Sequence, residues 1–380
     1  MKIGRVLHNL SQGDKAVYIA LISAFLPFQL TAVVLIILGL SLWILPKSRA
    51  LLLRKRADCI LIGIFFLINL IVSIIFSNWF GIMSAFAFLL IITLFEYSQS
   101  VMTSRLFENI LSLICIMSIL TTCSAIVERL IYIKLEKYRC ASFYFNPNYL
   151  GCILAVSVCV CAYKVIARRG KPLFFYCVAF FNGIGLYLSG SMFVWLTIFI
   201  CLSLMLILFG EHQFLSILMI VASILMLIIS AAPELIPRID ETVFTTENRI
   251  NIWKTAITAL GDYPLFGRGF FTYYLIQPDI AGAYPTTHCH NIILDSLLNF
   301  GVINSLVLLF YLFRYYSLLI KCHELSKSKR ISSFLIALSF AVMVHSMVDL
   351  TFIWIQTGII LILIMSGISA EKKHLRHYNK

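Results

Sequence analysis

Two histidines separated by one residue stand where the longest polar segment of the chain gives way to an apolar run. Residues 286–291 read Thr-Thr-His-Cys-His-Asn, and the apolar run begins at Ile292. A neutral imidazole can accept a proton near neutral pH. Because the first turn of a helix carries a partial positive charge, this position favours neutral imidazole and can also help to hold phosphate. The pattern therefore predicts that His290 or His288 serves as a general base.

Two other interpretations of this pair remain open. The histidines could be ordinary polar residues at a helix start, or they could hold a metal ion. No cluster of further ligands stands near them in the sequence, so we expect no metal and no other cofactor. Asp295 follows His290 by about one helical turn and is placed to orient it. Asn291 stands at the helix start, and we expect it, His288 and Asp295 to contact substrate.

An anionic substrate would call for arginine, whose planar fork matches phosphate oxygens in bidentate fashion. Arg139, Arg249 and Arg268 lie in the two longest polar loops. Snorkelling of these side chains at span ends is the alternative. Asn148 belongs to the segment Phe-Asn-Pro-Asn at 145–148, where asparagine has no apolar role and a hydrogen-bonding or capping role must explain it. We expect these four residues to bind substrate.

The composition defines the class of protein. The chain has 380 residues, of which 61% are hydrophobic and 12% charged, whereas soluble domains are about 25% charged. Several apolar stretches reach the roughly 20 residues that cross a bilayer as a helix. We predict one all-α integral membrane domain over 1–380, a polytopic bundle of about 11–12 spans. One or two passes fall within 16–45, and ten more fall at roughly 58–77, 80–97, 107–128, 149–167, 172–189, 191–209, 213–231, 291–320, 331–348 and 352–369.

The formal charge of +13 fits the orientation rule for membrane proteins, and no basic-aromatic module suggests nucleic acid. The most basic loop, 47–57, is expected in the cytoplasm, and hydropathy then places 168–172 and 321–330 on the same side. Loops 129–148 and 232–290 are expected outside. Within the large loop 232–290, helical spacing of apolar residues predicts an amphipathic helix from Glu247 to Leu260.

A few polar residues near the spans have several explanations. Glu96 and Glu128 lie near span ends, where solvent could explain them. His345 and Asp349 are spaced to pair with each other on a helix or to serve a site. Cys140 and Cys289 both fall in loops, so a disulfide between them is conceivable.

The order of these features resembles the O-antigen ligase and polymerase superfamily. His290-Asn291, nine residues and then Gly301 resembles its signature, and Phe145 to Gly151 resembles its Pro-Asn segment. Ser189-Gly190-Ser191 resembles its small-residue turn, although Met192 stands where such proteins commonly carry arginine. Arg249 to Trp253 and Gly267-Arg268-Gly269-Phe270 resemble its large outer loop. The resemblance covers about residues 130 to 310.

This resemblance implies a type C glycosyltransferase of the bacterial cytoplasmic (inner) membrane with an outward-facing active site. Such enzymes transfer a glycan from an undecaprenyl-pyrophosphate carrier to an acceptor hydroxyl, as a surface-polysaccharide ligase or polymerase. It implies His290 as the catalytic base, the outer arginines as pyrophosphate clamp and no metal. Its partners would be the lipid-linked donor, a glycan or lipid acceptor and membrane lipids. The residues leave ligase and polymerase undecided, and a lipid-linked glycan transporter or flippase is the alternative.

Overall fold

The computed structural model describes residues 12–135, 138–233, 242–326 and 328–378, which form helices and no strand. Eight helices in these residues are long and apolar enough to cross a membrane, and two shorter apolar ones, α10 and α15, accompany them. They correspond one to one to the ten spans predicted after residue 57, so the all-α, multi-pass architecture is confirmed. The spans are α5 (Arg56–Ile75), α6 (Trp79–Val101), α7 (Ser104–Ile131), α8 (Pro147–Ile166), α9 (Pro172–Ser189), α10 (Phe193–Phe209), α11 (His212–Ala231), α14 (Ile292–Leu325), α15 (Arg330–Ser346) and α16 (Ile355–Met365) continued by α17 (Ile368–Tyr378).

The apolar run 16–45 folds as two antiparallel helices, α2 (Gln12–Ser23) and α3 (Phe28–Ile44). Pro27 immediately precedes α3, and the Thr31 hydroxyl donates a 2.6 Å hydrogen bond to the Ser23 carbonyl across the turn. The short helix α4 (Pro46–Leu52) then bends by 90° from α3. This arrangement agrees with the two-segment alternative for that run rather than with one kinked helix.

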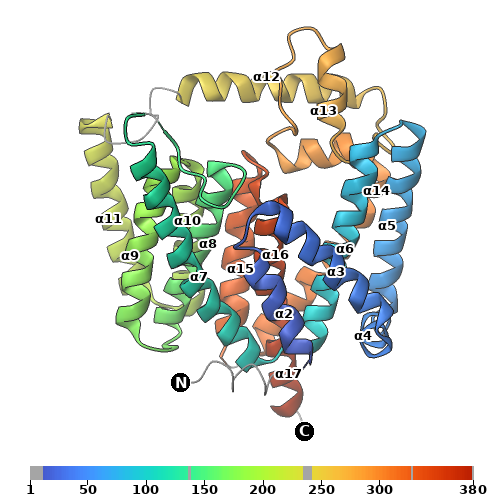
Figure 1. Cartoon of the computed structure of the whole chain (residues 1–380). Coiled ribbons are helices and arrows are strands. Elements are labelled where there is room, and N and C mark those ends of the chain that lie inside the picture. Colours follow the sequence, from blue (N-terminus) through green and yellow to red (C-terminus); the bar gives the residue numbers. More distant parts are fainter. Residues whose placement is uncertain (1–11, 136–137, 234–241, 327, 379–380) are drawn as a thin grey trace.

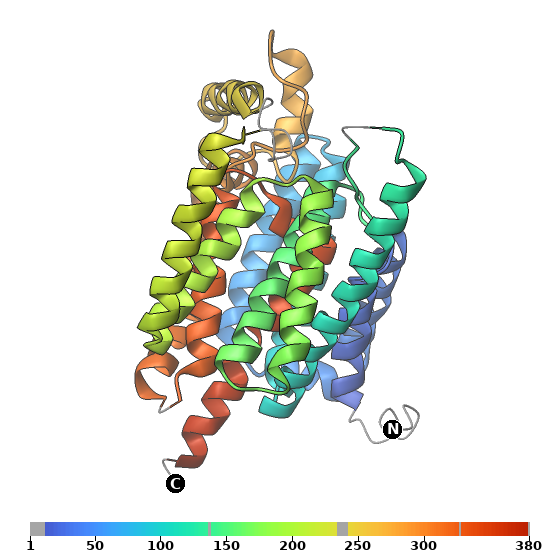
Figure 2. The same ribbon diagram turned by 90° about the vertical axis from the view of Figure 1, so that its left-hand side faces the viewer.

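The two ends of the bundle differ. α12 (Thr242–Leu260) lies across one end, beside α13 (Thr272–Ile276), as Figure 1 shows and the rotated view of Figure 2 confirms. We call it the α12 end. The turn between α8 and α9, the turn between α14 and α15, and α17 lie at the opposite end (Figure 1). The loops that the sequence assigned to the cytoplasm therefore share one end of the molecule.

Burial varies strongly among the spans. α8 is central, with 72% of its most apolar window buried, and its small Gly, Ala, Ser and Cys residues allow close approach of α7, α9 and α10. α11 has no buried residue. Among the helices that the structure describes, α10 is the only one with which it makes extensive contact. The core thus forms around α8, and α11 is a peripheral span.

α12 begins five residues earlier than predicted. Ile252, Ala256 and Ala259 are buried, whereas Ile250 and Ile257 are 43% and 59% exposed. Small residues face α14 because the two helices pack closely there. The larger isoleucines lie on the outer surface of the helix, so the predicted contact of an apolar face with the membrane surface stays a prediction.

A buried charge near the opposite end also differs from expectation. Glu96 is only 4% exposed, so solvent does not explain it. Its carboxylate accepts from Lys55 Nζ at 2.7 Å and from the Tyr311 hydroxyl at 2.6 Å. Because a buried charge is costly without partners, this network ties α6 to α14 and to the segment before α5.

Candidate active site

The turn that carries the histidine pair is fixed by Asn291, the N-cap of α14. Its side-chain oxygen accepts from the backbone N–H groups of Ile293 and Leu294 at 3.0 and 3.1 Å. Its side-chain nitrogen donates to the Met347 carbonyl at 3.1 Å. Asparagine at an N-cap satisfies helix N–H groups that would otherwise lack partners. Asn291 therefore starts α14 and also joins it to the segment that follows α15.

His290 is hydrogen-bonded to Asp349. The distance from His290 Nδ1 to Asp349 Oδ1 is 3.1 Å, and the side chains are 23% and 7% exposed. A carboxylate accepts from Nδ1–H, so the proton sits on Nδ1 and the Nε2 lone pair is left available. The Thr286 hydroxyl lies 3.3 Å from Nε2. The arrangement gives a partly exposed base whose tautomer is set by a buried carboxylate.

Asp349 lies in the break between α15 and α16, within residues 347–354. Burial alone would raise the pKa of its carboxyl, but the hydrogen bond and charge of His290 outweigh burial and hold the pKa below its usual range. Asp349 is thus an anion at neutral pH. It can stabilise the imidazolium that forms when His290 takes a proton.

The second carboxylate oxygen of Asp349 connects to two of the residues singled out in the sequence. Asn148 Nδ2 donates to Asp349 Oδ2 at 2.9 Å, and the Arg139 guanidinium donates to Asn148 Oδ1. Arg139 Nε also donates to the Ser189 carbonyl at 2.9 Å. The Pro-Asn segment and the small-residue turn, far apart in the sequence, are therefore joined through Arg139, and Asn148 links them to Asp349.

The loop that carries Arg139 is held by Glu128 rather than by solvent. The Glu128 carboxylate accepts from the backbone N–H groups of Ala141 and Ser142 and from the Tyr138 hydroxyl, at 2.6 to 3.2 Å. These contacts anchor residues 138–142 to the end of α7. Glu128 is thus explained as a support for the loop that presents Arg139.

His288 differs from His290 in its chemistry. Its Nδ1 accepts from the His290 backbone N–H at 3.2 Å. Burial, and then the neighbouring His290, lower the pKa of His288 to about 4. The ring is therefore neutral near pH 7, and one of its nitrogens is already occupied. Of the two imidazoles, His290 is the better placed to take a proton from a substrate.

Asp295 has another role than the one expected of it. Its Oδ1 accepts from the Cys289 backbone N–H at 2.9 Å, and its Oδ2 accepts from Asn299 Nδ2 at 2.7 Å. The carboxylate that orients the His290 ring is Asp349. Asp295 instead fixes the backbone of the residue before His290. The Trp253 indole donates to the Cys289 carbonyl at 3.0 Å, so Trp253 supports the site loop as well.

Asp349 and His345 do not form the side-chain pair that their spacing allowed. α15 ends at Ser346, and the Asp349 backbone N–H still bonds the His345 carbonyl at 3.0 Å, but the Asp349 carboxylate bonds His290 and Asn148 instead of the His345 ring. The two ring nitrogens of His345 lie 2.8 Å from Thr197 Oγ1 and 3.0 Å from Thr351 Oγ1. For Asp349 the structure agrees with the second alternative that the sequence left open, a place at the site. Cys140 and Cys289 are both free thiols, so the conceivable disulfide is absent.

The backbone of α14 is broken at Gly301, and this break explains why the pattern that begins with His290-Asn291 ends in a glycine. Gly301 has φ +62°, and a Cβ there would lie 2.3 Å from the backbone of Leu265 and Phe266. The backbone N–H groups of Val302 and Ile303 bond the carbonyls of Pro264 and Leu265 at 2.8 and 3.0 Å. The glycine is needed because the large loop docks against α14 at this point. Asn304, three residues after Gly301, is buried and donates to the Phe65 carbonyl.

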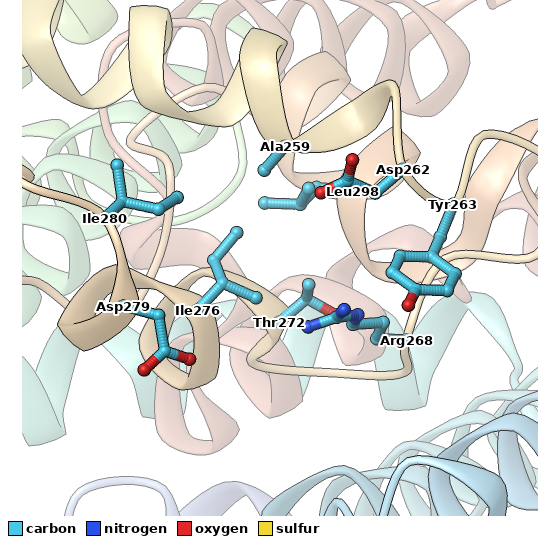
Figure 3. A pocket seen from close by; sticks show the side chains of 9 residues that line it. All are labelled: Ala259, Asp262, Tyr263, Arg268, Thr272, Ile276, Asp279, Ile280 and Leu298. Carbon is cyan, nitrogen blue, oxygen red and sulfur yellow. The ribbon is translucent and has the colours of Figure 1, made fainter.

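The three arginines fall into two places. Arg139 and Arg249 lie by the α9–α10 turn, where the Arg249 guanidinium carbon is 4.8 Å from the centroid of the Phe193 ring. Arg268 instead stacks over Tyr263 at 4.1 Å and lines a cavity of about 260 Å³ between α12, α13 and α14 (Figure 3). None of the residues that line this cavity is His290, Asp349 or Asn148.

A third possible metal ligand, which the sequence did not predict, lies near the two histidines. Potential ligand atoms of His288, His290 and Asp349 all lie within 4.8 Å of one another. Two imidazoles and one carboxylate form a donor set that transition metals accept. The same three groups are equally satisfied by the hydrogen bonds described above, which need no ion.

The fold and site define a multi-pass membrane protein with a histidine–carboxylate pair at the α12 end. Residues 177–312 match the family model described as O-antigen ligase. No curated protein matches the chain. The family match confirms the resemblance to the O-antigen ligase and polymerase superfamily and supports a glycosyltransferase-like enzyme that acts on lipid-linked glycan and an acceptor. The matched segment includes Arg249, Arg268, the histidine pair and Gly301.

Proposed function

We propose that the protein transfers a glycan from an undecaprenyl-pyrophosphate carrier to an acceptor hydroxyl, with His290 as general base. The observation that carries the proposal is the contact of His290 with Asp349, which leaves Nε2 available beside Thr286. A base poised in this way suits removal of a proton from an attacking hydroxyl. The family match supports the same reaction class.

In the proposed reaction the acceptor hydroxyl takes the place of the Thr286 hydroxyl next to His290 Nε2. Its oxygen attacks the anomeric carbon of the donor sugar while Nε2 accepts the proton. The bond from that carbon to the pyrophosphate oxygen breaks, and the pyrophosphate leaves on its polyprenyl chain. Asp349 stabilises the imidazolium through Nδ1, as a buried carboxylate does for a catalytic histidine.

The pyrophosphate is held in this proposal by Arg139 and Arg249. Arg139, from the loop between α7 and α8, is fixed through Asn148 and Ser189, and Arg249 of α12 lies over Phe193, so both side chains lie beside the α9–α10 turn. Two such cations can stabilise the charge that develops on a leaving pyrophosphate without a metal ion. The exposed apolar faces of the surrounding spans would accommodate the polyprenyl chain.

The proposed orientation puts the α12 end outside the cytoplasmic membrane. An impermeant thiol reagent applied to intact spheroplasts should label Thr258→Cys on the exposed face of α12 and should not label Ser328→Cys in the turn between α14 and α15. Both sites become labelled once the membrane is permeabilised. Because the basic loops lie at the opposite end, the orientation rule favours this result. Labelling of both positions, or only of Ser328→Cys, in intact spheroplasts would contradict the orientation.

The reaction itself is tested with the purified protein in proteoliposomes. A polyprenyl-pyrophosphate-linked glycan and acceptor material from cells that naturally carry the protein should yield the extended glycan and free polyprenyl pyrophosphate. We expect the rate to survive a chelator, because the base mechanism uses the His290 lone pair rather than a bound ion. Loss of activity with chelator and its return with a divalent ion would instead make His288, His290 and Asp349 ligands. Absence of any transfer would reject the proposed function.

Arg249→Ala should lower transfer by about 10–100-fold, the usual effect of losing hydrogen bonds to a charged group. Arg249→Lys should restore only part of the rate, since lysine lacks the bidentate fork. Lys254→Ala removes an exposed cation from the same helix and is the matched control, expected to leave the rate unchanged. Steady-state kinetics with the lipid-linked donor measure the effect. An Arg249→Ala enzyme with normal donor affinity and turnover would show that Arg249 is no part of the clamp.

A further inference from the structure

The cavity lined by Arg268 is a space that the proposed chemistry does not use. α12 contributes Ala259, the segment after it contributes Asp262 and Tyr263, and α14 contributes Leu298. Its volume of about 260 Å³ is slightly below the range of roughly 300–1,000 Å³ typical of drug-sized ligands. A space of that size suits a single small ring.

The Arg268 side chain is the strongest sign that a ligand belongs there. Figure 3 shows it extending toward the middle of the cavity, with Asp279 and Ile280 on the far side. Its Nε is buried and makes no hydrogen bond in the part of the chain that the structure describes, and no carboxylate there forms an ion pair with it. A buried donor without a partner costs free energy, and the same Arg268 side chain lines the cavity, where its guanidinium can bond an acceptor.

The rest of the lining selects the kind of ligand. Asp262 and Asp279 are exposed at the cavity and offer carboxylate acceptors, while Ile276, Ile280 and Leu298 form an apolar wall. Two carboxylates against one guanidinium disfavour an anion such as pyrophosphate. Hydroxyl groups suit this lining, because each can donate to a carboxylate and accept from arginine. The C–H face of a sugar ring would then lie on the apolar wall.

The cavity is also connected to the catalytic turn. Leu298 lies six residues after the start of α14, which is roughly 9 Å along the helix. Thr272 of the cavity wall bonds through its N–H to Asn299 Oδ1 at 3.0 Å, and Asn299 Nδ2 donates to Asp295, which holds the residue before His290. A glycan whose reacting end lies at His290 could place a neighbouring sugar in the cavity.

We propose that this cavity is a saccharide subsite that binds one uncharged sugar residue of the glycan chain, through Arg268, Asp262 and Asp279. The subsite rests on the proposed glycan transfer and deepens it, since it separates Arg268 from the pyrophosphate clamp. The sugar could belong to the donor glycan or to the acceptor glycan. The chemistry of recognition is the same in both cases, and kinetics distinguish them.

The test uses full-length protein in nanodiscs with the His290→Gln substitution, so that binding is measured without turnover. The probe is the oligosaccharide released by mild acid from the surface polysaccharide of cells that naturally carry the protein, and calorimetry measures its affinity. Ala259→Trp should abolish binding by filling the cavity. Asp279→Asn, at an exposed position that folding tolerates, should weaken binding about tenfold, the lower end for a hydrogen bond to a charged group. Ile257→Trp places the same indole on the exposed face of α12 and should leave binding unchanged.

The outcomes separate the subsite from the reaction. Oligosaccharide binding that is lost only in the cavity variants supports the subsite even if the reconstituted protein transfers no glycan. Absence of binding to the parent protein, or equal binding by Asp279→Asn, Ala259→Trp and Ile257→Trp variants, overturns the subsite even if transfer is observed. In the otherwise native enzyme, Asp279→Asn should raise the KM for lipid-linked donor if the donor glycan occupies the cavity, and the KM for acceptor if the acceptor does.

Discussion

His290→Gln should leave the protein folded and able to bind its lipid-linked donor, while turnover falls by about 10²–10⁴-fold, the usual contribution of a general base. Glutamine keeps a polar side chain of similar reach but has no nitrogen lone pair that accepts a proton at neutral pH. The side chain is only partly buried, so its replacement should cost little stability. Single-turnover kinetics with pre-bound donor measure the chemical step directly.

His288→Ala is the matched control for that experiment. Its ring is neutral near pH 7 and its Nδ1 is occupied by the His290 N–H, so its loss should affect turnover less than the loss of His290. An inactive His288→Ala enzyme beside a fully active His290→Gln enzyme would assign the base to the other imidazole. Full activity in both variants would remove the catalytic role of this turn altogether.

The sequence predicted the architecture well because membrane insertion depends on local composition. A helix that crosses lipid must satisfy its backbone internally and present apolar side chains over its whole length, so hydropathy alone located the spans. The face of α12 that packs against α14 was not predicted. Its packing is decided by α14 and by the site loop, and Trp253 bonds Cys289 across 36 residues of sequence. A local periodicity carries no information about such a partner.

The sequence predicted only those site residues whose types are unusual in their local surroundings. His290 and Asn291 stand out because their types are unusual at the start of an apolar run, and Asn148 stands out likewise. Asp349 is 59 residues from His290, and its spacing from His345 suggested a helical neighbour. Only the end of α15 at Ser346 and the Asn291 bond to Met347 turn that carboxylate toward the histidine. Similarly, nothing in the sequence separates Arg268 from the other two arginines.

The second large effect is expected from Asp349→Asn. The asparagine keeps the size of the aspartate and can still bond Asn148 and His290, but its amide presents an NH₂ group as readily as an oxygen. When that NH₂ faces Nδ1, the imidazole carries its proton on Nε2 and can no longer accept one from the acceptor hydroxyl. The negative charge that stabilises the imidazolium is lost as well. We therefore expect turnover to fall by about 10²–10⁴-fold, in the range seen when a catalytic histidine loses its base function or its carboxylate.

A purely structural role for Asp349 predicts a different pattern, and the kinetics can tell the two apart. If Asp349 acts through His290, kcat falls in Asp349→Asn while the KM for donor stays near its normal value. The double variant of Asp349→Asn and His290→Gln is then no slower than His290→Gln alone, because the rate effects of two residues that act as one unit do not add. Asp58→Asn provides the control, since it removes a carboxylate that pairs with Arg314 at 2.8 Å near the opposite end. It should leave kcat unchanged. The contrary result would be an Asp349→Asn protein that folds poorly or binds donor weakly but has normal turnover per bound donor. Asp349 would then only hold the break after α15 in place, and His290 would not depend on it for catalysis.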